Sequence, residues 1–296
     1  MRQRSPRCWL TVATLLGCAG AASAQDAGAL RSKQAALREQ LANNQFGRAL
    51  AIESTETSGN LKGDVYAVAD QPYAVVGPAL QGMDHWCDIL MLHLNVKDCG
   101  WRGSGATSAL NVAIGRKFDQ PVADAHKVEF SYRVVANTAD YLQVQLSAES
   151  GPMGTKDYHI VLEATPIDAK KSFVHMSYSY GFGMAAQIAM QGYLATLGRN
   201  KVGFTIVDRK SDGTPVYEGN VRGVIERNAM RYYLAIDAYL AALSAPAADQ
   251  PEKRIRGWIA MVERYPKQLR EMEPEEYLVM KRKELARQQA TVAKAN

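Results

Sequence analysis

The feature that constrains this chain most is a run of five segments with the alternating pattern of β-strands, separated only by short turns. They cover residues 109–116, 127–136, 141–147, 156–164 and 172–180. In the second segment, Val128, Phe130 and Tyr132 alternate with charged and polar residues, so only one side of that strand is expected to be buried. Turn-forming residues such as Gly151-Pro152 lie between the segments. The pattern predicts an antiparallel meander with one buried face.

Further strands and helices flank this meander. Extended runs at 48–56 and 61–69 predict a hairpin, followed by short helices at 73–80 and 84–90 and a strand at 92–96. Helical periodicity begins at residue 184, and a small hairpin is expected at 202–207 and 215–218. The strongest helical period spans 221–243, where apolar residues recur every three or four positions: Val221, Ile225, Tyr232, Ile236, Tyr239 and Leu243. A meander followed by a long helix predicts an α+β fold.

The N-terminus has the three parts of a secretory signal. Arg2, Arg4 and Arg7 precede an apolar run, and small residues end it at Ala22-Ser23-Ala24, after which we expect cleavage. The apolar run is shorter than the ~20 residues that a helix needs to span a bilayer. A competing interpretation is a lipoprotein signal, in which Cys18 would be acylated and would tether the protein to the outer membrane. The sequence therefore predicts a periplasmic location.

The charge balance argues against nucleic acid as a partner. Removing the three arginines of the signal from 35 Lys and Arg leaves 32 basic side chains against 30 acidic ones. Binding to phosphate backbones requires a strongly basic face, whereas here Lys and Arg are interspersed with Glu. With 47% hydrophobic residues, the chain can bury one sizeable core.

Two of the four cysteines lie in the signal, which leaves Cys87 and Cys99 in the exported protein. An oxidising compartment favours a disulfide between them, and closing so short a loop would stabilise the fold by roughly 3 kcal/mol. Two buried free thiols are the alternative. No Cys-x-x-Cys or paired-His spacing indicates a zinc site, and we expect neither a metal nor a cofactor.

The C-terminal part is rich in charge. Residues 245–251 have the composition of a linker, and 252–269 and 274–293 predict two helices in which Glu alternates with Lys or Arg. That alternation is typical of a solvated face, and docking on an envelope protein or a membrane surface is the other interpretation. The expected organisation is a signal peptide at 1–24, an N-terminal helix at 25–46, a ligand-binding domain at 47–244, and a linker with a charged helical tail at 245–296.

Several residues on the predicted inner face combine an apolar body with a polar or flexible tip. Such a lining suits an amphiphilic ligand better than a dry core, although the same side chains could simply pack beneath the long helix. The candidate ligand-binding residues are Phe130, Tyr132, Val144, Tyr158, Ile160, Met176, Tyr178, Tyr180, Tyr232 and Ile236. His159 and His175 alternate with these positions, so we expect both histidines to face away from the cavity.

No catalytic signature identifies an enzyme. The sequence has no Gly-x-Ser-x-Gly elbow, no His-Glu-x-x-His and no phosphate-binding loop. Asp84, His85, Asp88 and His93 lie close together in the sequence, and we interpret them as a solvated acidic helix turn rather than as a metal or acid-base site. An enzyme stays open as an alternative, because one or two polar groups in an apolar pocket can be enough for catalysis.

The order of hairpin, two short helices, curved meander and long helix over residues 48–244 resembles the helix-grip fold of the START and polyketide-cyclase-like (SRPBCC) superfamily. The local sequences that carry the resemblance are Gly63-Asp64-Val65-Tyr66-Ala67-Val68, Trp86-Cys87-Asp88-Ile89-Leu90 and Asn228-Ala229-Met230-Arg231-Tyr232-Tyr233. The resemblance implies a deep cavity between the sheet and the long helix that holds a lipid, a polyketide or another apolar molecule. The export signal, the cysteine pair, the late hairpin and the helical tail depart from the common pattern, so the type of ligand is not carried over.

These features predict a periplasmic carrier or sensor that binds a hydrophobic or amphiphilic, lipid-like small molecule. The alternatives are a cyclase- or hydrolase-like enzyme with the same pocket and an envelope interaction protein that docks through its helical tail.

Overall fold

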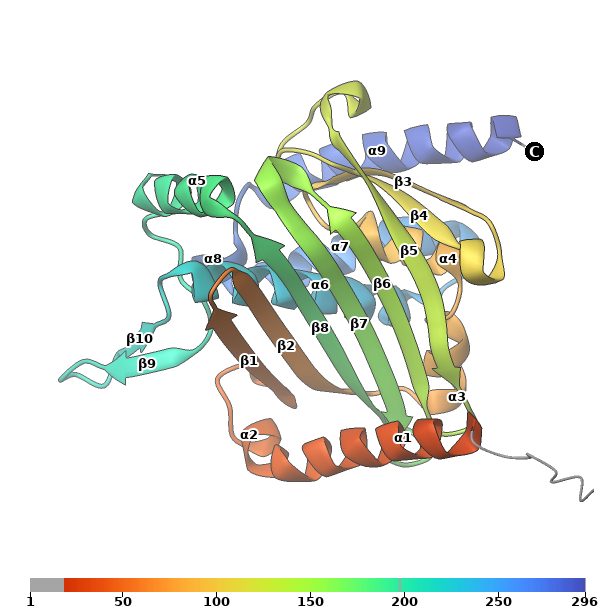
Figure 1. Ribbon diagram of the computed structural model, residues 1–296, viewed down its shortest axis with the longest axis horizontal. Helices are drawn as coiled ribbons and strands as arrows, with labels where there is room; N and C mark the ends of the chain where they lie inside the picture. The colour runs from red at the N-terminus through yellow and green to blue at the C-terminus, as the bar shows by residue number, and fades with distance from the viewer. Residues whose placement is uncertain (1–18, 197, 296) are drawn as a thin grey trace, which may run out of the picture.

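The computed structural model describes residues 19–196 and 198–295, and its main sheet has eight antiparallel strands in the order β1-β2-β8-β7-β6-β5-β4-β3 (Figure 1). The strands are β1 (Leu50–Thr57), β2 (Asn60–Ala69), β3 (Val96–Arg102), β4 (Ala109–Ile114), β5 (His126–Asn137), β6 (Leu142–Ser150), β7 (Thr155–Pro166) and β8 (Ser172–Phe182). A separate hairpin is formed by β9 (Ile206–Arg209) and β10 (Pro215–Tyr217). Most of the predicted signal, including Cys18, lies outside the described residues, so cleavage and acylation stay predictions.

Nine α-helices occur in the described part of the chain. They are α1 (Ala19–Ala36), α2 (Arg38–Ala42), α3 (Tyr73–Ala79), α4 (Met83–Leu90), α5 (Met184–Ala195), α6 (Val221–Ala242), α7 (Gln250–Val262), α8 (Pro266–Leu269) and α9 (Pro274–Ala295). Short 3-10 turns occupy Gly105–Thr107, Val122–Asp124, Pro152–Gly154 and Ala247–Asp249. No helix within the described ranges is long and apolar enough to cross a membrane.

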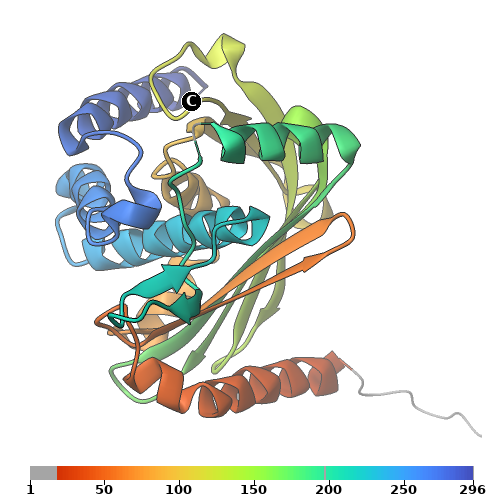
Figure 2. The same ribbon diagram turned by 90° about the vertical axis from the view of Figure 1, so that its left-hand side faces the viewer.

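The sheet curves around α6, and helices cover both of its faces (Figure 2). The concave face holds α6, α7 packs on α6, and α9 packs on α7 and β3. On the convex face, α1 crosses the strands and buries Leu30 and Leu37 together with Tyr66, Tyr141 and Phe173. This architecture confirms the predicted α+β helix-grip class, with a curved antiparallel sheet wrapped on a long helix and extra C-terminal helices.

The strand pattern explains which residues reach the core. In β6, Leu142, Val144 and Leu146 are buried and the residues between them are more accessible, as alternation requires. In β8, residues on both faces are buried, because α6 covers one face and α1 covers the other. The β1–β2 turn contains Gly59 at φ +83, a conformation that glycine adopts without steric cost.

Two predicted elements are wrong in detail. Residues 92–96 were expected to form a strand, but β3 begins only at Val96, because side chains take the place of a neighbouring strand: Tyr277 and Lys281 of α9 donate to the carbonyls of Leu92 and His93, and Lys97 donates to that of Leu94. The helix predicted at 252–269 is two helices, and Pro266 begins the second because its ring cannot continue the first.

The C-terminal helices contribute to the core as well as to the surface. Their charged residues alternate as expected, but Ile255, Trp258 and Tyr277 are buried. The rings of Trp258 and Tyr277 stack at 4.8 Å, and Trp258 Nε1 donates a hydrogen bond to the Arg231 carbonyl on α6. The apolar stripe of the tail is therefore occupied within the chain, and α6 is buried on nearly all sides rather than along one stripe.

A charged cluster lies on the convex face, opposite α6. His175 on β8 donates from Nδ1 to Glu163 at 2.6 Å and from Nε2 to Asp64 at 2.8 Å. Tyr66 stacks on the imidazole at 4.3 Å. Burial by itself would lower the pKa of His175, but the two hydrogen bonds to carboxylates outweigh it, so the pKa is raised. The same bonds lower the pKa of both carboxyls against the effect of burial.

This cluster predicts a stability window. The folded-state pKa of His175 lies above its unfolded value, so its contribution is complete below pH about 6.5 and is lost as the pH rises through the raised pKa. The carboxylates act in the opposite sense, and their contribution is lost as the pH falls below about 4. We expect His175→Gln to lower the free energy of unfolding by about 1–3 kcal/mol at pH about 6 and to flatten its decline toward pH about 9.

Urea denaturation at several pH values measures this effect. His159→Gln is the matched control, since His159 is exposed on the neighbouring strand β7. Equal pH profiles for the two variants would contradict the assignment of the decline to His175.

Candidate functional site

An aromatic surface covers one end of the concave face beneath α6. Phe130 on β5, Tyr158 on β7, and Tyr178 and Tyr180 on β8 are all buried. Tyr158 is central, with ring centroids 6.2 Å from Phe130, 6.2 Å from Tyr178 and 5.4 Å from Tyr180. Alternation along each strand turns these four side chains inward, as the sequence predicted. We call them, together with Tyr232 of α6, the tyrosine cluster.

Tyr232 connects the cluster to a histidine in the α4–β3 loop. Its ring lies 5.1 Å from the ring of Tyr178 and stacks at 4.7 Å on the imidazole of His93. Tyr232 is only partly buried, whereas its neighbours on α6 at positions 231 and 233 are buried. One row of rings therefore runs from the sheet across α6 to the loop.

One polar group in this row is buried without a hydrogen-bond partner among the described residues. It is His93 Nε2, and the residue is only 3% exposed. Burial raises the pKa of the Tyr178 and Tyr232 phenols and keeps both protonated. Buried polar groups are normally paired, so the unpaired nitrogen indicates a place where another molecule can supply the partner.

The protonation state of His93 follows from its contacts. The backbone N–H of Asn95 donates to Nδ1 at 3.2 Å, so the neutral ring carries its proton on Nε2. Burial lowers the pKa of His93 well below its ordinary value, and the nearby cations Arg231, Lys281 and Lys117 lower it further. The side chain is therefore a neutral hydrogen-bond donor.

Helix α9 fixes the loop that carries His93. Lys281 Nζ donates to the carbonyls of His93 and Val96, both at 2.8 Å, and Tyr277 donates to the carbonyl of Leu92. Lys97 Nζ donates to the carbonyl of Leu94. Both ammonium groups also pair with Glu284, at 2.7 Å for Lys281 and 3.1 Å for Lys97, and all three side chains are fully buried. Burial lowers the pKa of Lys281 to about 8.

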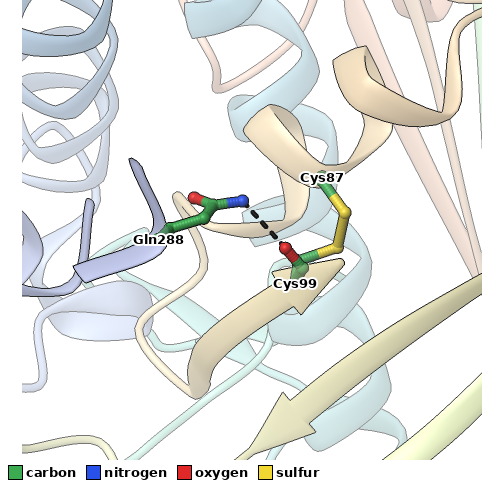
Figure 3. Close-up of a disulfide and its surroundings, with 3 residues drawn as sticks. All are labelled: Cys87, Cys99 and Gln288. Atoms are coloured by element: carbon green, nitrogen blue, oxygen red, sulfur yellow. Dashed lines mark hydrogen bonds between the residues drawn. A yellow bond between two sulfur atoms is a disulfide. The ribbon is translucent and has the colours of Figure 1, made fainter. Parts of the chain in front are cut away.

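The predicted disulfide fastens the same loop from its two ends. Cys87 of α4 and Cys99 of β3 are bonded, with their Cα atoms 5.3 Å apart (Figure 3). Gln288 of α9 donates to the Cys99 carbonyl at 2.9 Å, so the tail helix also contacts the bridge (Figure 3). The loop is therefore held by one covalent bond and by several hydrogen bonds from α9.

The ten predicted ligand-binding residues all belong to the one large core between the sheet and α6. The structure brings five of them together as the tyrosine cluster. Tyr132 differs, because its hydroxyl donates to the Gln81 carbonyl before α4 and is already satisfied. The others are buried aliphatic or thioether side chains around the cluster: Val144, Ile160, Met176 and Ile236.

The sequence interpretation missed His93. It was grouped with Asp84, His85 and Asp88 as part of a solvated turn, but it lies in a buried loop beyond α4. The available signal was its position inside the apolar run Met91-Leu92-His93-Leu94. Asp88 is used structurally, in an ion pair with Arg254 at 2.5 Å. His159 and His175 lie on the convex face, away from the tyrosine cluster, and no group of three metal-ligating side chains occurs among the described residues.

Hollows on other surfaces of the protein have volumes of about 640 to 670 Å³. One lies on the convex face of β5 to β7 and is lined by Glu129, Ser147 and His159. Another lies between α2 and β9, and a third beside Asp70 and Arg264. The tyrosine cluster is the better candidate site, because it combines a large apolar surface with the buried, unpaired Nε2 of the adjacent His93.

Comparisons with known proteins find solved structures of similar fold only. Neither a family model nor a curated protein matches the chain. The chain is similar to Ara h 8.0201 (TM-score 0.38, 11% identity, 62% of this chain and 99% of that chain). It is similar to norcoclaurine synthase from Thalictrum flavum (TM-score 0.32, 13% identity, 51% of this chain and 84% of that chain). It is also similar to Zhui aromatase/cyclase from Streptomyces sp. R1128 (TM-score 0.32, 8% identity, 47% of this chain and 74% of that chain). These structures have helix-grip folds, and at such low scores the likeness bears on neither ligand nor activity.

The charge network around Glu284 gives a test of how the site loop is held. Glu284→Gln would leave two buried lysines without a carboxylate, and we expect it to lower the free energy of unfolding by about 3–5 kcal/mol. Lys283→Met is the matched control on the same helix, since it breaks an exposed pair with Asp119 and should cost no more than about 1 kcal/mol. Urea denaturation measures both values. Similar losses in the two variants would show that Glu284 does not hold the loop.

Proposed function

We propose that this protein is an exported binding protein that holds a hydrophobic or amphiphilic small molecule between its curved sheet and α6. The supporting observation is the row of His93, Tyr232 and Tyr178, which places the buried, unpaired Nε2 of His93 at the edge of a buried aromatic surface. An amphiphile fits such a surface because its apolar part can lie on the rings while its polar part accepts a hydrogen bond from that nitrogen.

The position of α5 supports an entrance at one end of the sheet. This helix lies across that end, near the turn Pro152–Gly154 (Figure 2). The Tyr180 hydroxyl contacts Met190 Sδ of α5 at 3.8 Å, so the helix borders the tyrosine cluster. Met184 and Ile188 of α5 and Met153 of the turn are exposed. Exposed apolar side chains on α5 and on this turn are suited to the passage of an apolar molecule into the site.

Export is part of the proposal and rests on the signal pattern at residues 1–24. Expression of the full chain in a Gram-negative host, with fractionation and mass measurement, tests it. A periplasmic protein that begins at Gln25 supports ordinary cleavage, whereas a membrane-bound protein acylated at Cys18 supports the lipoprotein alternative. Retention of the uncleaved chain in the cytoplasm would contradict export.

An enzyme with the same pocket is the second candidate. The observation that favours it is the buried Nε2–H of the neutral His93 imidazole, because such a donor can stabilise negative charge that develops on a substrate oxygen. Extraction of the purified protein with organic solvent followed by mass spectrometry distinguishes the two. An intact bound amphiphile supports the carrier, and conversion of an added ester or polyketide supports the enzyme.

A pair of tyrosines on opposite faces of the sheet tests the binding site. Tyr178 and Tyr66 are each 7% exposed and lie on the paired strands β8 and β2, but Tyr66 faces α1. We expect Tyr178→Ala to weaken binding of the apolar fluorophore N-phenylnaphthylamine about tenfold. Tyr66→Ala should leave binding unchanged and lower the free energy of unfolding by about 3–5 kcal/mol, because its ring stacks on Phe173 and His175 beneath α1.

Fluorescence titration and urea denaturation of both variants give the two readouts. Equal affinities for the fluorophore in wild type and Tyr178→Ala would remove the tyrosine cluster as the binding surface.

A further inference from the structure

The His93 end of the site differs in chemistry from the rest. Most of the tyrosine cluster is ring surface, whereas at its end on α6 the buried Nε2–H of His93 has no acceptor among the described residues. A buried donor without an acceptor is costly, and so it favours any ligand that brings an oxygen to it. This observation alone predicts an oxygen-bearing ligand.

The charges around His93 indicate whether the oxygen of the ligand belongs to a neutral or to an anionic group. Arg231, Lys117, Lys97 and Lys281 all act electrostatically on its imidazole. Glu271 pairs with Arg231 at 2.7 Å and with Lys117 at 2.8 Å, and Glu284 pairs with Lys97 and Lys281. Four cations thus stand with two carboxylates, and this set of ion-paired groups carries net positive charge. In a buried region, where screening is weak, such a charge attracts an anion.

The neutral state of His93 fits this role. A neutral imidazole donates one hydrogen bond and adds no charge of its own, so the anion is attracted by the surrounding cations and oriented by Nε2–H. The ring of Tyr232, stacked directly on the imidazole, gives the apolar part of the ligand a surface beside this donor. The cations are already fixed in ion pairs and therefore need not move when the ligand binds.

We infer that the ligand is an acidic amphiphile, whose carboxylate accepts a hydrogen bond from His93 Nε2 while its apolar chain lies on the tyrosine cluster toward α5. This inference rests on the proposed binding function and names the class of ligand. It also predicts the orientation of the ligand, with its acidic group at the α4–β3 loop and the end of its apolar chain at α5.

Dodecanoate and dodecanol test the inference, because they share one chain and differ in the head group. Isothermal titration calorimetry at pH about 7, where the free acid is ionised and Lys281 is mostly charged, gives the affinity of the full mature chain for each. We expect dodecanoate to bind about ten- to a hundredfold more tightly than dodecanol. In His93→Phe, which keeps a ring for stacking on Tyr232 but removes the donor, the preference should fall about tenfold or more. His159→Phe is the control and should keep the full preference.

The outcomes separate the inference from the proposed function. If dodecanol binds as tightly as dodecanoate to the wild type, the acidic class is wrong while the binding function stands. If neither probe binds, the binding function fails and the inference fails with it. If His93→Phe keeps the preference for dodecanoate, the acid is bound elsewhere. The comparison of the two probes on the wild type needs no variant, so it holds even if His93→Phe does not fold.

Discussion

The buried carboxylate of Glu284 is the interaction on which much of this architecture depends. Two fully buried ammonium groups, one from β3 and one from α9, meet on its two oxygens. Without it, two buried ammonium groups would have no counter-charge, and their hydrogen bonds to the carbonyls of the α4–β3 loop would be weakened. The same network therefore attaches the C-terminal helix to the domain and shapes the loop that presents His93.

The two ends of that loop show how covalent and non-covalent constraints combine. The Cys87–Cys99 bridge limits the unfolded chain, while the donors of α9 determine the conformation between the cysteines. A disulfide alone would bring β3 close to α4 but would not orient a side chain between them. The position of His93 beside Tyr232 is thus a product of the tail helix, although the tail is remote from the loop in sequence.

Side chains on the two faces of strand β8 have different roles. Its inward residues Tyr178 and Tyr180 form the aromatic surface under α6, and its outward residue His175 binds two carboxylates beneath α1. The outward cluster is paired through both imidazole nitrogens and serves stability, whereas the inward row ends at His93 Nε2, which is buried without a partner. A buried donor without an acceptor favours a ligand that supplies one, and this contrast is the basis of the binding function proposed for the concave face.

The sequence by itself determined the α+β class, the two-residue alternation of the meander, the hairpin before it and the long helix after it, because these features depend on local periodicity. It also indicated the cysteine pair and the inward direction of the tyrosines. Only the tertiary structure decided which charged residues are buried. Lys97, Lys281 and Glu284 look like surface residues in a charged helix pattern, and His93 was assigned to a solvated turn, because a local pattern cannot show that an opposite charge from a distant segment will meet a side chain. The ion pairs and the unpaired His93 nitrogen that define the site exist only where α9, β3 and α6 meet.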